Sequence, residues 1–421
     1  MLISKDTMPH RARWAASFVT GLLLIGTMGI GLTSQAIAQG KPTVSKAAAK
    51  PLKAAQEAME AKKYQEALNR LHEAQAVQGK NGYDQFLIDE MLGYIAVRTK
   101  DYPEAARSLE AGLNSSYFNK SETAARINAL AQVNYALKNY DKAIEYGTRA
   151  VKEGSADDEM YTLVSQAYYL KGDNRNTKRF VDSYVDELIK RGTTPKEQYL
   201  QLVMSACTKL EDSDCVTHSL ERLVAYYPKP EYWQNLLYSL FQVKDQTDKS
   251  MLHLYRLASE VDVLKRPEDY TEMAQLAIEQ GSPGEAERIL EKGFQKKIFP
   301  DARSQDKNKR LLASAKQKAA VDQASLPKVD KDAAAEGTGA KDVSVGLAYL
   351  SYQQYDKAVT ALTRGLAKPG VRNEPEARLL LGIAQLEAGK KDDAMKTFKA
   401  VKGDPKFERL ANLWNLHARQ A

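Results

Sequence analysis

The sequence is poor in the residues from which metal sites and catalytic centres are built. Its 421 residues include 2 cysteines and 5 histidines, and the histidines are at least 35 residues apart along the chain. It also contains no HExxH pair, no glycine-rich phosphate loop and no nucleophile elbow. The sequence therefore predicts no cofactor, no metal site and no catalytic residues. We expect a protein that is not an enzyme.

Long blocks of one charge are also missing. Lysine and arginine number 61 against 54 aspartates and glutamates, which gives a net charge of +7, and the two signs alternate along the chain. A nucleic-acid-binding face normally gathers its basic residues on one helix or stripe. We therefore expect a solvated surface and no nucleic acid among the partners.

One long apolar run is present, close to the N-terminus. Lys5, Arg11 and Arg13 precede an apolar stretch over residues 15–32, and Ala36-Ile37-Ala38 follows it. This order is typical of a secretory signal peptide with an A-x-A cleavage site, so residues 1–38 are predicted to be a signal peptide that is cut after Ala38. The alternative is a retained anchor, which the four glycines of the run disfavour. After cleavage, no integral membrane segment is expected.

A helical hairpin pattern begins in residues 91–113, which read MLGYIAVRTKDYPEAARSLEAGL. Leu92 and Gly93 are placed on a first helix, a turn follows at residues 100–103, and Ala105 and Leu109 lie one turn apart on a second helix. Leu-Gly before the turn and A-x3-L after it resemble the signature of the tetratricopeptide repeat.

The small residue at the position of Ala105 recurs every 33 to 39 residues, close to the roughly 34 residues of one tetratricopeptide unit. The recurring positions are Ala67, Ala105, Ala143, Thr177, Val216, Lys249, Ala286, Ala324, Ala358 and Ala394. The pattern predicts an all-α fold, a right-handed α-solenoid of about ten helical hairpins with a C-terminal capping helix. Hairpins 1–7 are assigned to residues 51–300, hairpins 9 and 10 to 342–403 and the cap to 404–421, after a linker over 39–50.

Residues 301–341 are harder to assign. They are polar, rich in alanine and interrupted by Pro327, which is typical of a flexible segment. The distance from Ala286 to Ala358 nevertheless equals two repeats, so Leu311, Leu312 and Ala324 can mark a degenerate eighth hairpin. Both interpretations stay open, and in either one this is expected to be the least stable part of the array.

The two cysteines, Cys207 and Cys215, fall at the end of a first helix and the start of the second helix of one hairpin. A disulfide there would join the two helices at their turn, as export to an oxidising compartment permits. Two buried thiols are the alternative. No CxxC motif is present, so redox catalysis by these cysteines is not expected.

The first-helix residues that point away from the paired second helix form the candidate binding face. Counting from the position of Gly93 selects mostly amides and aromatic rings: Tyr94, Asn128, Gln132, Tyr135, Gln166, Tyr169, Gln201, Gln234, Tyr238 and Phe241. Amides donate and accept hydrogen bonds to an extended backbone, and aromatic faces stack on proline or aliphatic side chains. These residues are predicted to form a peptide-binding groove. The alternative is a merely polar, solvated inner surface.

Several segments resemble the exported tetratricopeptide proteins of TonB energy-transduction systems in Gram-negative bacteria. They are Asn81-Gly82-Tyr83, residues 223–233 (LVAYYPKPEYW), Ile289-Leu290-Glu291-Lys292-Gly293 and Leu380-Leu381-Gly382-Ile383-Ala384. The resemblance covers most of residues 51–402. It implies a periplasmic accessory that works beside TonB, ExbB and ExbD in outer-membrane uptake, and it supplies no catalytic residues.

We therefore expect a non-enzymatic periplasmic scaffold that binds protein or extended peptide segments and assists TonB-dependent transport. A proline-rich segment of TonB is the hypothetical ligand of the Tyr and Gln groove. The alternative is a scaffold for envelope assembly or secretion that uses the same groove.

Overall fold

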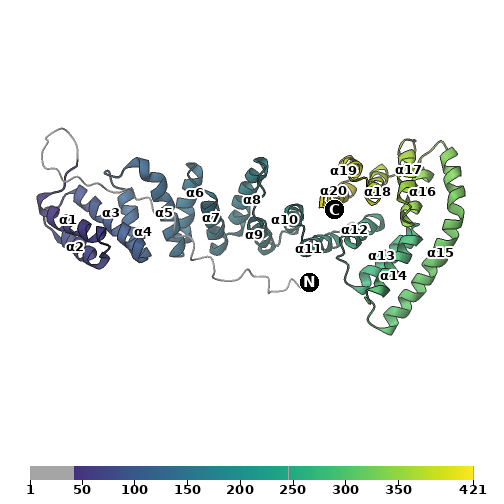
Figure 1. Ribbon diagram of the computed structural model, residues 1–421, viewed down its shortest axis with the longest axis horizontal. Helices are drawn as coiled ribbons and strands as arrows, with labels where there is room; N and C mark the ends of the chain where they lie inside the picture. Colours follow the sequence, from purple (N-terminus) through teal and green to yellow (C-terminus); the bar gives the residue numbers. More distant parts are fainter. Residues whose placement is uncertain (1–41, 245, 421) are drawn as a thin grey trace. The chain divides into compact units, whose positions relative to one another are not determined.

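The structure is a computed structural model that describes residues 42–244 and 246–420 (Figure 1). The predicted signal peptide, residues 1–38, lies outside the described residues. Within those ranges every regular element is a helix and no strand occurs, so the predicted all-α fold is confirmed. No helix in this part of the chain is both long and apolar enough to cross a membrane.

The chain divides into two compact units, Met1–Arg191 (unit 1) and Gly192–Ala421 (unit 2). From residue 42 onward, where the structure describes it, unit 1 consists of four helical hairpins and a short 3-10 turn. Its hairpins are α1 (Lys46–Glu60) with α2 (Tyr64–Ala76), α3 (Gly82–Thr99) with α4 (Tyr102–Leu113), α5 (Thr123–Ala136) with α6 (Tyr140–Lys152), and α7 (Asp158–Lys171) with α8 (Asn174–Lys190); η1 (Lys120–Glu122) precedes α5.

The linker expected over residues 39–50 is partly helical, because α1 already begins at Lys46. Ser45 caps this helix, its Oγ accepting the N–H of Ala48 at 3.2 Å. The backbone N–H of Ser45 in turn donates to the buried carboxylate of Asp84 at 3.0 Å. Residues 47–49 are all alanine, the strongest helix former, so the chain becomes helical before the first repeat position.

The turn between α3 and α4 shows how the repeated pattern ends one helix and starts the next. Lys100 has a φ of 62°, a left-handed conformation that stops α3. Asp101 then caps α4 by accepting the N–H of Glu104 at 3.2 Å. Pro103 lies in the first turn of α4, where no N–H is needed.

Small residues let the two helices of a hairpin approach closely, as predicted. A Cβ added to Gly93 on α3 would lie 3.2 Å from Leu109 Cδ2 on α4. The marker residues that are fully buried are Ala67, Ala105, Ala143, Thr177, Ala286, Ala358 and Ala394. Lys249 does not follow the prediction, because it is exposed and its neighbour Ser250 is the buried small residue.

Unit 2 contains five hairpins and two single helices. The hairpins are α9 (Glu197–Lys209) with α10 (Ser213–Tyr226), α11 (Pro230–Phe241) with α12 (Asp248–Glu260), α13 (Pro267–Glu279) with α14 (Pro283–Gln295), α16 (Ala340–Ser351) with α17 (Tyr355–Leu366), and α18 (Glu374–Glu387) with α19 (Lys391–Lys399). The single helices are α15 (Ala302–Ala335) and α20 (Pro405–Gln420).

One helix of 34 residues, α15, occupies most of the segment for which a degenerate hairpin or a flexible segment was predicted. Residues 302–326 contain no glycine and no proline and are rich in alanine, lysine and glutamine, so helix propensity favours one continuous helix over a turn. Pro327 lies inside the helix without ending it. Ala324, the supposed marker of a second helix, is exposed on α15.

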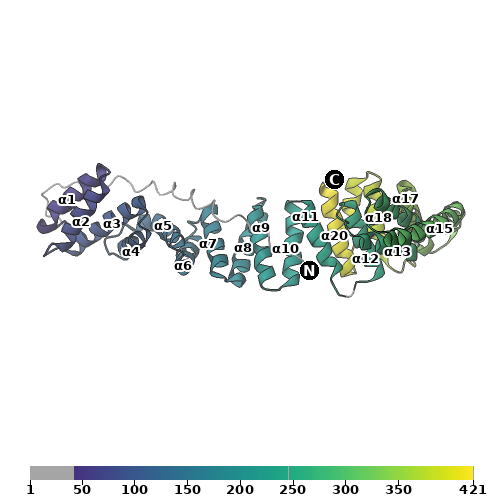
Figure 2. The same cartoon turned by 90° about the horizontal axis from the view of Figure 1, so that it is seen from below.

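The single helix α15 interrupts the alternation of hairpin helices, so the helix-to-helix contacts change on its C-terminal side. Beyond it, α14 contacts α16, α16 contacts α18, and α18 contacts α20. Helix α20 also contacts α12 and α10, so this part of unit 2 closes on itself (Figure 2). The predicted capping helix therefore covers the last hairpin, with Trp414 against Phe398 at a ring distance of 6.4 Å, and also joins it to α12.

A disulfide joins Cys207 at the end of α9 to Cys215 at the start of α10, with Cα atoms 5.6 Å apart. Of the two alternatives for these cysteines, the structure has the bonded pair. Asp212 fixes the start of α10 beside it, because its carboxylate accepts the N–H of Cys215 at 3.0 Å. The bond closes a short loop, since the two residues are separated by 8 positions.

Replacing both cysteines by alanine is expected to lower the free energy of unfolding of unit 2 by about 2–3 kcal/mol, because the crosslink restricts the unfolded chain. Urea unfolding followed by tryptophan fluorescence measures this, since Trp233 and Trp414 both lie in unit 2. The wild-type protein with a reductant is the control, because it loses the bond without losing any side-chain volume. Equal unfolding midpoints with and without reductant would contradict the prediction.

Candidate functional site

The predicted groove residues all lie on first helices, as the repeat register requires. In unit 1 they belong to α3, α5 and α7, and in unit 2 to α9 and α11. Every one is half-buried except Gln201, which is exposed. They alternate with fully buried neighbours such as Ile95 and Leu130, which face the paired second helix. The structure thus places this set along the surface that the hairpin cores leave uncovered.

In unit 1, the groove side chains of α5 and α7 are hydrogen-bonded to each other. The hydroxyl of Tyr135 donates to Gln166 Oε1 at 2.8 Å. Burial, together with the neighbouring Tyr140, raises the pKa of Tyr135 to about 12, so its hydroxyl stays a neutral donor. Its ring also contacts the ring of Tyr140 at 5.9 Å. This tyrosine therefore links two successive hairpins while one edge of its ring remains at the surface.

Asn128 on α5 has a feature that the sequence pattern does not show. Its Oδ1 atom is buried and has no hydrogen-bond partner among the described residues. Leaving a buried carbonyl oxygen unpaired costs about 1–3 kcal/mol, so native proteins rarely do it. Near the N-terminal end of the face, the guanidinium of Arg98 lies 5.2 Å from the ring centre of Tyr94. The face of unit 1 thus combines aromatic rings with an amide that lacks a partner.

In unit 2, the corresponding residues are more fully engaged with the next hairpin. Gln201 donates to the hydroxyl of Tyr232 at 2.7 Å, and Lys265 donates to Gln234 at 3.0 Å. Tyr238 donates to Asp269 at 2.5 Å. Each of these bonds spans 31 residues, one repeat along the chain.

The aromatic groove residues of unit 2 also make ring contacts. Phe241 packs on Tyr255 at a ring distance of 4.6 Å, and Arg266 covers the ring of Tyr238 at 4.7 Å. Burial and the carboxylate of Asp269 raise the pKa of Tyr238 to about 12, so this hydroxyl also remains protonated. Among the described groove residues, the buried amide oxygen that lacks a partner belongs to Asn128 of unit 1, so unit 1 is the better candidate for a ligand-binding face.

Sequence reasoning missed a buried ion pair beside the unit 1 face. Arg126 on α5 donates to both oxygens of Glu90 on α3, at 2.7 and 2.5 Å, and each side chain is 8% exposed. Arg126 also donates to the carbonyl of Leu109 at 3.2 Å, and Phe118 lies 4.8 Å from its guanidinium. The lack of a side chain at Gly112 leaves room for the pair. No local pattern identifies it, because its partners are 36 residues apart.

A second, partly buried network of charged residues holds the closed part of unit 2 together. Lys249, His253, Arg256 and Glu260 lie on one face of α12, at the spacing of successive helical turns. Lys249 Nζ is 2.7 Å from Glu376 Oε2 on α18, and His253 Nε2 is 3.6 Å from the other oxygen of the same carboxylate.

The other two residues of this face reach α14 and α20. Arg256 donates to Glu285 on α14 at 2.7 Å, and Glu260 lies 3.6 Å from His417 on α20. The charges of α12 thus contact three other helices of the closed part.

Burial determines how these groups titrate. Burial lowers the pKa of His253, and the nearby carboxylate of Glu376 only partly opposes this effect. Burial acts to raise the pKa of Glu285, but the neighbouring Arg256 outweighs it and the pKa is lowered. For Glu376 burial is likewise outweighed, by His253 and Lys249. We therefore expect His253 to be neutral and both glutamates to be ionised near pH 7.

Comparison with known families finds tetratricopeptide repeats at two places in the chain. Residues 52–117 and 346–406 match the tetratricopeptide repeat model. The first match includes α3 and α4, where the hairpin pattern is clearest, and the second runs from within α16 through α17, α18 and α19. No match is found among curated proteins. In the described part of the chain, no three His, Cys, Asp or Glu side chains form a group that could hold a metal ion.

Several solved structures resemble this chain. Naa15/Naa10 bound to HypK-THB aligns at 14% identity with a TM-score of 0.30, over 88% of this chain and 62% of that one. The TPR2AB domain of yeast Sti1 in a pHSP90 complex aligns at 13% identity and a TM-score of 0.24, over 71% and 97% of the two chains. Yeast Tom70 aligns at 12% identity with a TM-score of 0.24, over 89% of this chain and 96% of that one. The aligned region thus spans under two thirds of the first of these chains.

Proposed function

We propose that this chain, in which residues 52–117 and 346–406 match tetratricopeptide repeats, is a non-enzymatic scaffold that binds extended segments of partner proteins. Stacked hairpins leave one surface of first helices uncovered, and an extended peptide can lie across several of them. The binding face is that of unit 1, lined by Tyr94, Asn128, Gln132, Tyr135, Gln166 and Tyr169.

The observation that carries the proposal is the chemistry of this face around Asn128. Its buried Oδ1 lacks a partner, and an N–H of a bound backbone would supply one after a small rotation of the amide. The half-buried ring of Tyr135 lies on the same helix as Asn128, and those of Tyr94 and Tyr169 lie on the neighbouring first helices α3 and α7. Aromatic rings suit proline-containing peptides, whose prolines stack on the rings, while a non-proline residue of the peptide supplies the N–H that Asn128 Oδ1 needs.

The finer proposal is a periplasmic accessory of TonB-dependent transport that captures a proline-rich segment of TonB. It is supported by the signal-like pattern of residues 1–38 and by the sequence resemblance to TonB-associated repeat proteins. A proline-rich segment is already extended before it binds, so little conformational entropy is lost on binding.

Replacing Tyr94, Tyr135 and Tyr169 together by alanine is expected to weaken the binding of a dye-labelled proline-rich TonB peptide by roughly tenfold or more. Each lost aromatic contact is worth about 0.5–1.5 kcal/mol beyond its buried area. Fluorescence anisotropy titration measures the dissociation constant.

Tyr64→Ala is the matched control, because this half-buried tyrosine lies on the second helix α2. It should leave the affinity unchanged, and circular dichroism should show that both proteins are folded. An affinity that is the same for the triple variant and the wild type would contradict the proposed face. Failure of the peptide to bind the wild type would remove TonB as the partner.

A further inference from the structure

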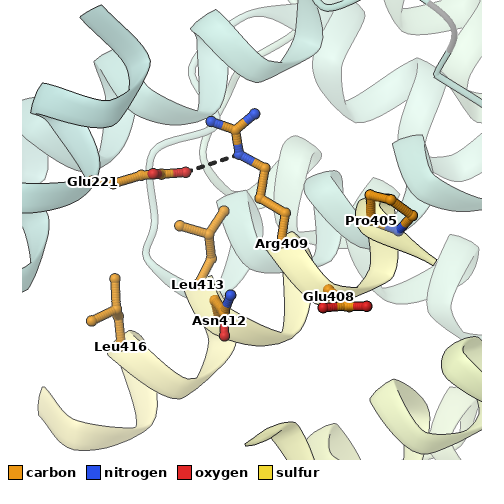
Figure 3. A pocket seen from close by; sticks show the side chains of 7 residues that line it. All are labelled: Glu221, Pro405, Glu408, Arg409, Asn412, Leu413 and Leu416. Atoms are coloured by element: carbon orange, nitrogen blue, oxygen red, sulfur yellow. Dashed lines mark hydrogen bonds and ion pairs between the residues drawn. The ribbon is translucent and has the colours of Figure 1, made fainter. Parts of the chain in front are cut away.

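A cleft in unit 2 lies outside the surface proposed above. It runs along α20, between this helix and the helices α10 and α12, and Figure 3 shows its larger part. The larger cavity has a volume of about 370 Å³ and the smaller about 180 Å³. Pro405, Arg409 and Leu413 line both cavities, so they form one continuous site. We call it the α20 cleft.

The α20 cleft has aliphatic side chains in both cavities, and they predominate in the smaller one. Leu413 and Leu416 project from α20 toward α10 in the larger cavity (Figure 3). Leu240 and Leu254 line the smaller cavity beside Val243, which is 43% exposed in the loop between α11 and α12. The smaller cavity has room for about one side chain of leucine size, which would bury apolar area there.

Arg409 lies where the two cavities meet, and most of its hydrogen-bonding capacity is unused. Its Nε donates to Glu221 Oε1 on α10 at 2.8 Å, as the dashed line in Figure 3 shows. A guanidinium has five N–H donors, and in the described part of the chain the others have no hydrogen-bond partner. Its side chain is 40% exposed. Two N–H groups on one edge can therefore still hold a carboxylate in the usual paired geometry.

Three described cations line the smaller cavity. They are Lys244, Lys406 and Arg409, and none of the described residues that line it is a carboxylate. In the larger cavity, Glu221 is already paired with Arg409, while Glu408 accepts the N–H of Gly403 at 2.9 Å and pairs with Lys402. The positive charge therefore lies at the smaller cavity beside its aliphatic walls, where it complements an anion that carries an aliphatic side chain.

We infer that the α20 cleft binds an acidic segment of a partner protein, in which a carboxylate pairs with Arg409 and a neighbouring leucine-like side chain enters the cavity beside Val243. A peptide fits better than a membrane surface, because the site is concave and takes a single side chain. This site and the tyrosine face of unit 1 share no residue and no helix. The chain thus has two binding sites with different chemistry, one for proline-rich and one for acidic segments.

Fluorescence anisotropy with the whole chain and a short dye-labelled peptide, in which two glutamates alternate with two leucines, tests this site. We expect saturable binding that weakens as salt is added, because the contacts are ionic. Arg409→Gln should weaken it by roughly tenfold or more, since it removes charge-assisted hydrogen bonds. Val243→Asp, in an exposed loop, should weaken it as strongly by adding a negative charge at the mouth of the smaller cavity.

Arg303→Gln and Val321→Asp are the matched controls, because both residues are exposed on α15. They should leave the affinity unchanged, as should the triple tyrosine variant of unit 1, whose result concerns only the first proposal. The inference is overturned if the wild type does not bind the peptide, if glutamines in place of its glutamates bind equally well, or if the Arg409 variant binds like the wild type. Arg409-dependent binding to vesicles with anionic lipid, without peptide binding, would assign the cleft to membranes instead.

Discussion

Replacing Arg126 by methionine is expected to lower the free energy of unfolding of unit 1 by about 3–5 kcal/mol. The substitution leaves the carboxylate of Glu90 8% exposed without the guanidinium that neutralises it. A buried charge without a partner is far more costly than a lost surface contact. Urea unfolding followed by circular dichroism measures the loss, and amide hydrogen exchange of α3 and α5 assigns it to unit 1.

Two control variants separate the buried charge from the loss of packing. The double variant Glu90→Leu with Arg126→Met should recover most of the stability, because no charge then remains buried. Arg149→Met breaks the pair of Arg149 with Glu153, whose side chains are 45% and 41% exposed, and should cost less than about 1 kcal/mol. If Arg126→Met is no more destabilising than Arg149→Met, the buried pair does not stabilise unit 1.

Acidification from pH 6.5 to pH 4 is expected to destabilise unit 2. Burial lowers the pKa of His253, so its contribution to stability is present above the unfolded pKa of 6.5 and is lost as the pH falls. One such group gives a slope of up to roughly 1.4 kcal/mol per pH unit. Below pH 4.5, Glu285 and Glu376 add to the loss because their pKa values are lowered. Urea unfolding at several pH values, followed by tryptophan fluorescence, measures it.

The groups that face His253 determine how far this effect extends. They are Arg256 on the same helix, Glu285 on α14, Glu376 on α18 and Phe407 on α20, whose ring lies 5.9 Å from the imidazole. Burial raises the pKa of Glu387, so this group opposes the loss of stability as the pH falls. It is one group, whereas His253, Glu285 and Glu376 all contribute to the loss.

His253→Gln should flatten the stability profile between pH 4.5 and 6.5 and leave the carboxylate part below pH 4.5 in place. His218→Gln is the matched control, because His218 is exposed on α10. A variant profile with the wild-type slope above pH 4.5 would show that another group titrates there.

Much of the fold could be predicted from the sequence, and the positions that failed show the limit of the method. Leu92, Gly93, Ala105 and Leu109 predicted a hairpin because helix periodicity, capping and turn residues are local properties. The same spacing rule placed a hairpin marker at Ala324, where residues of high helix propensity continue α15 without a turn. Repeat length alone therefore does not predict a turn.

The candidate site was only partly predictable for a related reason. Counting from Gly93 correctly placed Tyr94, Tyr135 and Gln166 on first helices. It could not show that Tyr135 donates to Gln166 or that Asn128 lacks a partner, because such contacts depend on how successive hairpins pack. In unit 2 the same counting selected Gln201, Gln234 and Tyr238, which are already hydrogen-bonded to residues one repeat further along the chain.

The sequence by itself determined that this chain forms helical hairpins, since small and apolar residues recur at one repeat length and the caps and turns lie within each repeat. Only the tertiary structure decided that α15 stays a single helix and that α20 returns to α12 and α10. The Arg409 to Glu221 contact joins residues 188 positions apart, and the pair of Arg126 with Glu90 joins neighbouring repeats. A local pattern describes each helix, whereas a charge is stabilised by whichever helix the packing brings beside it.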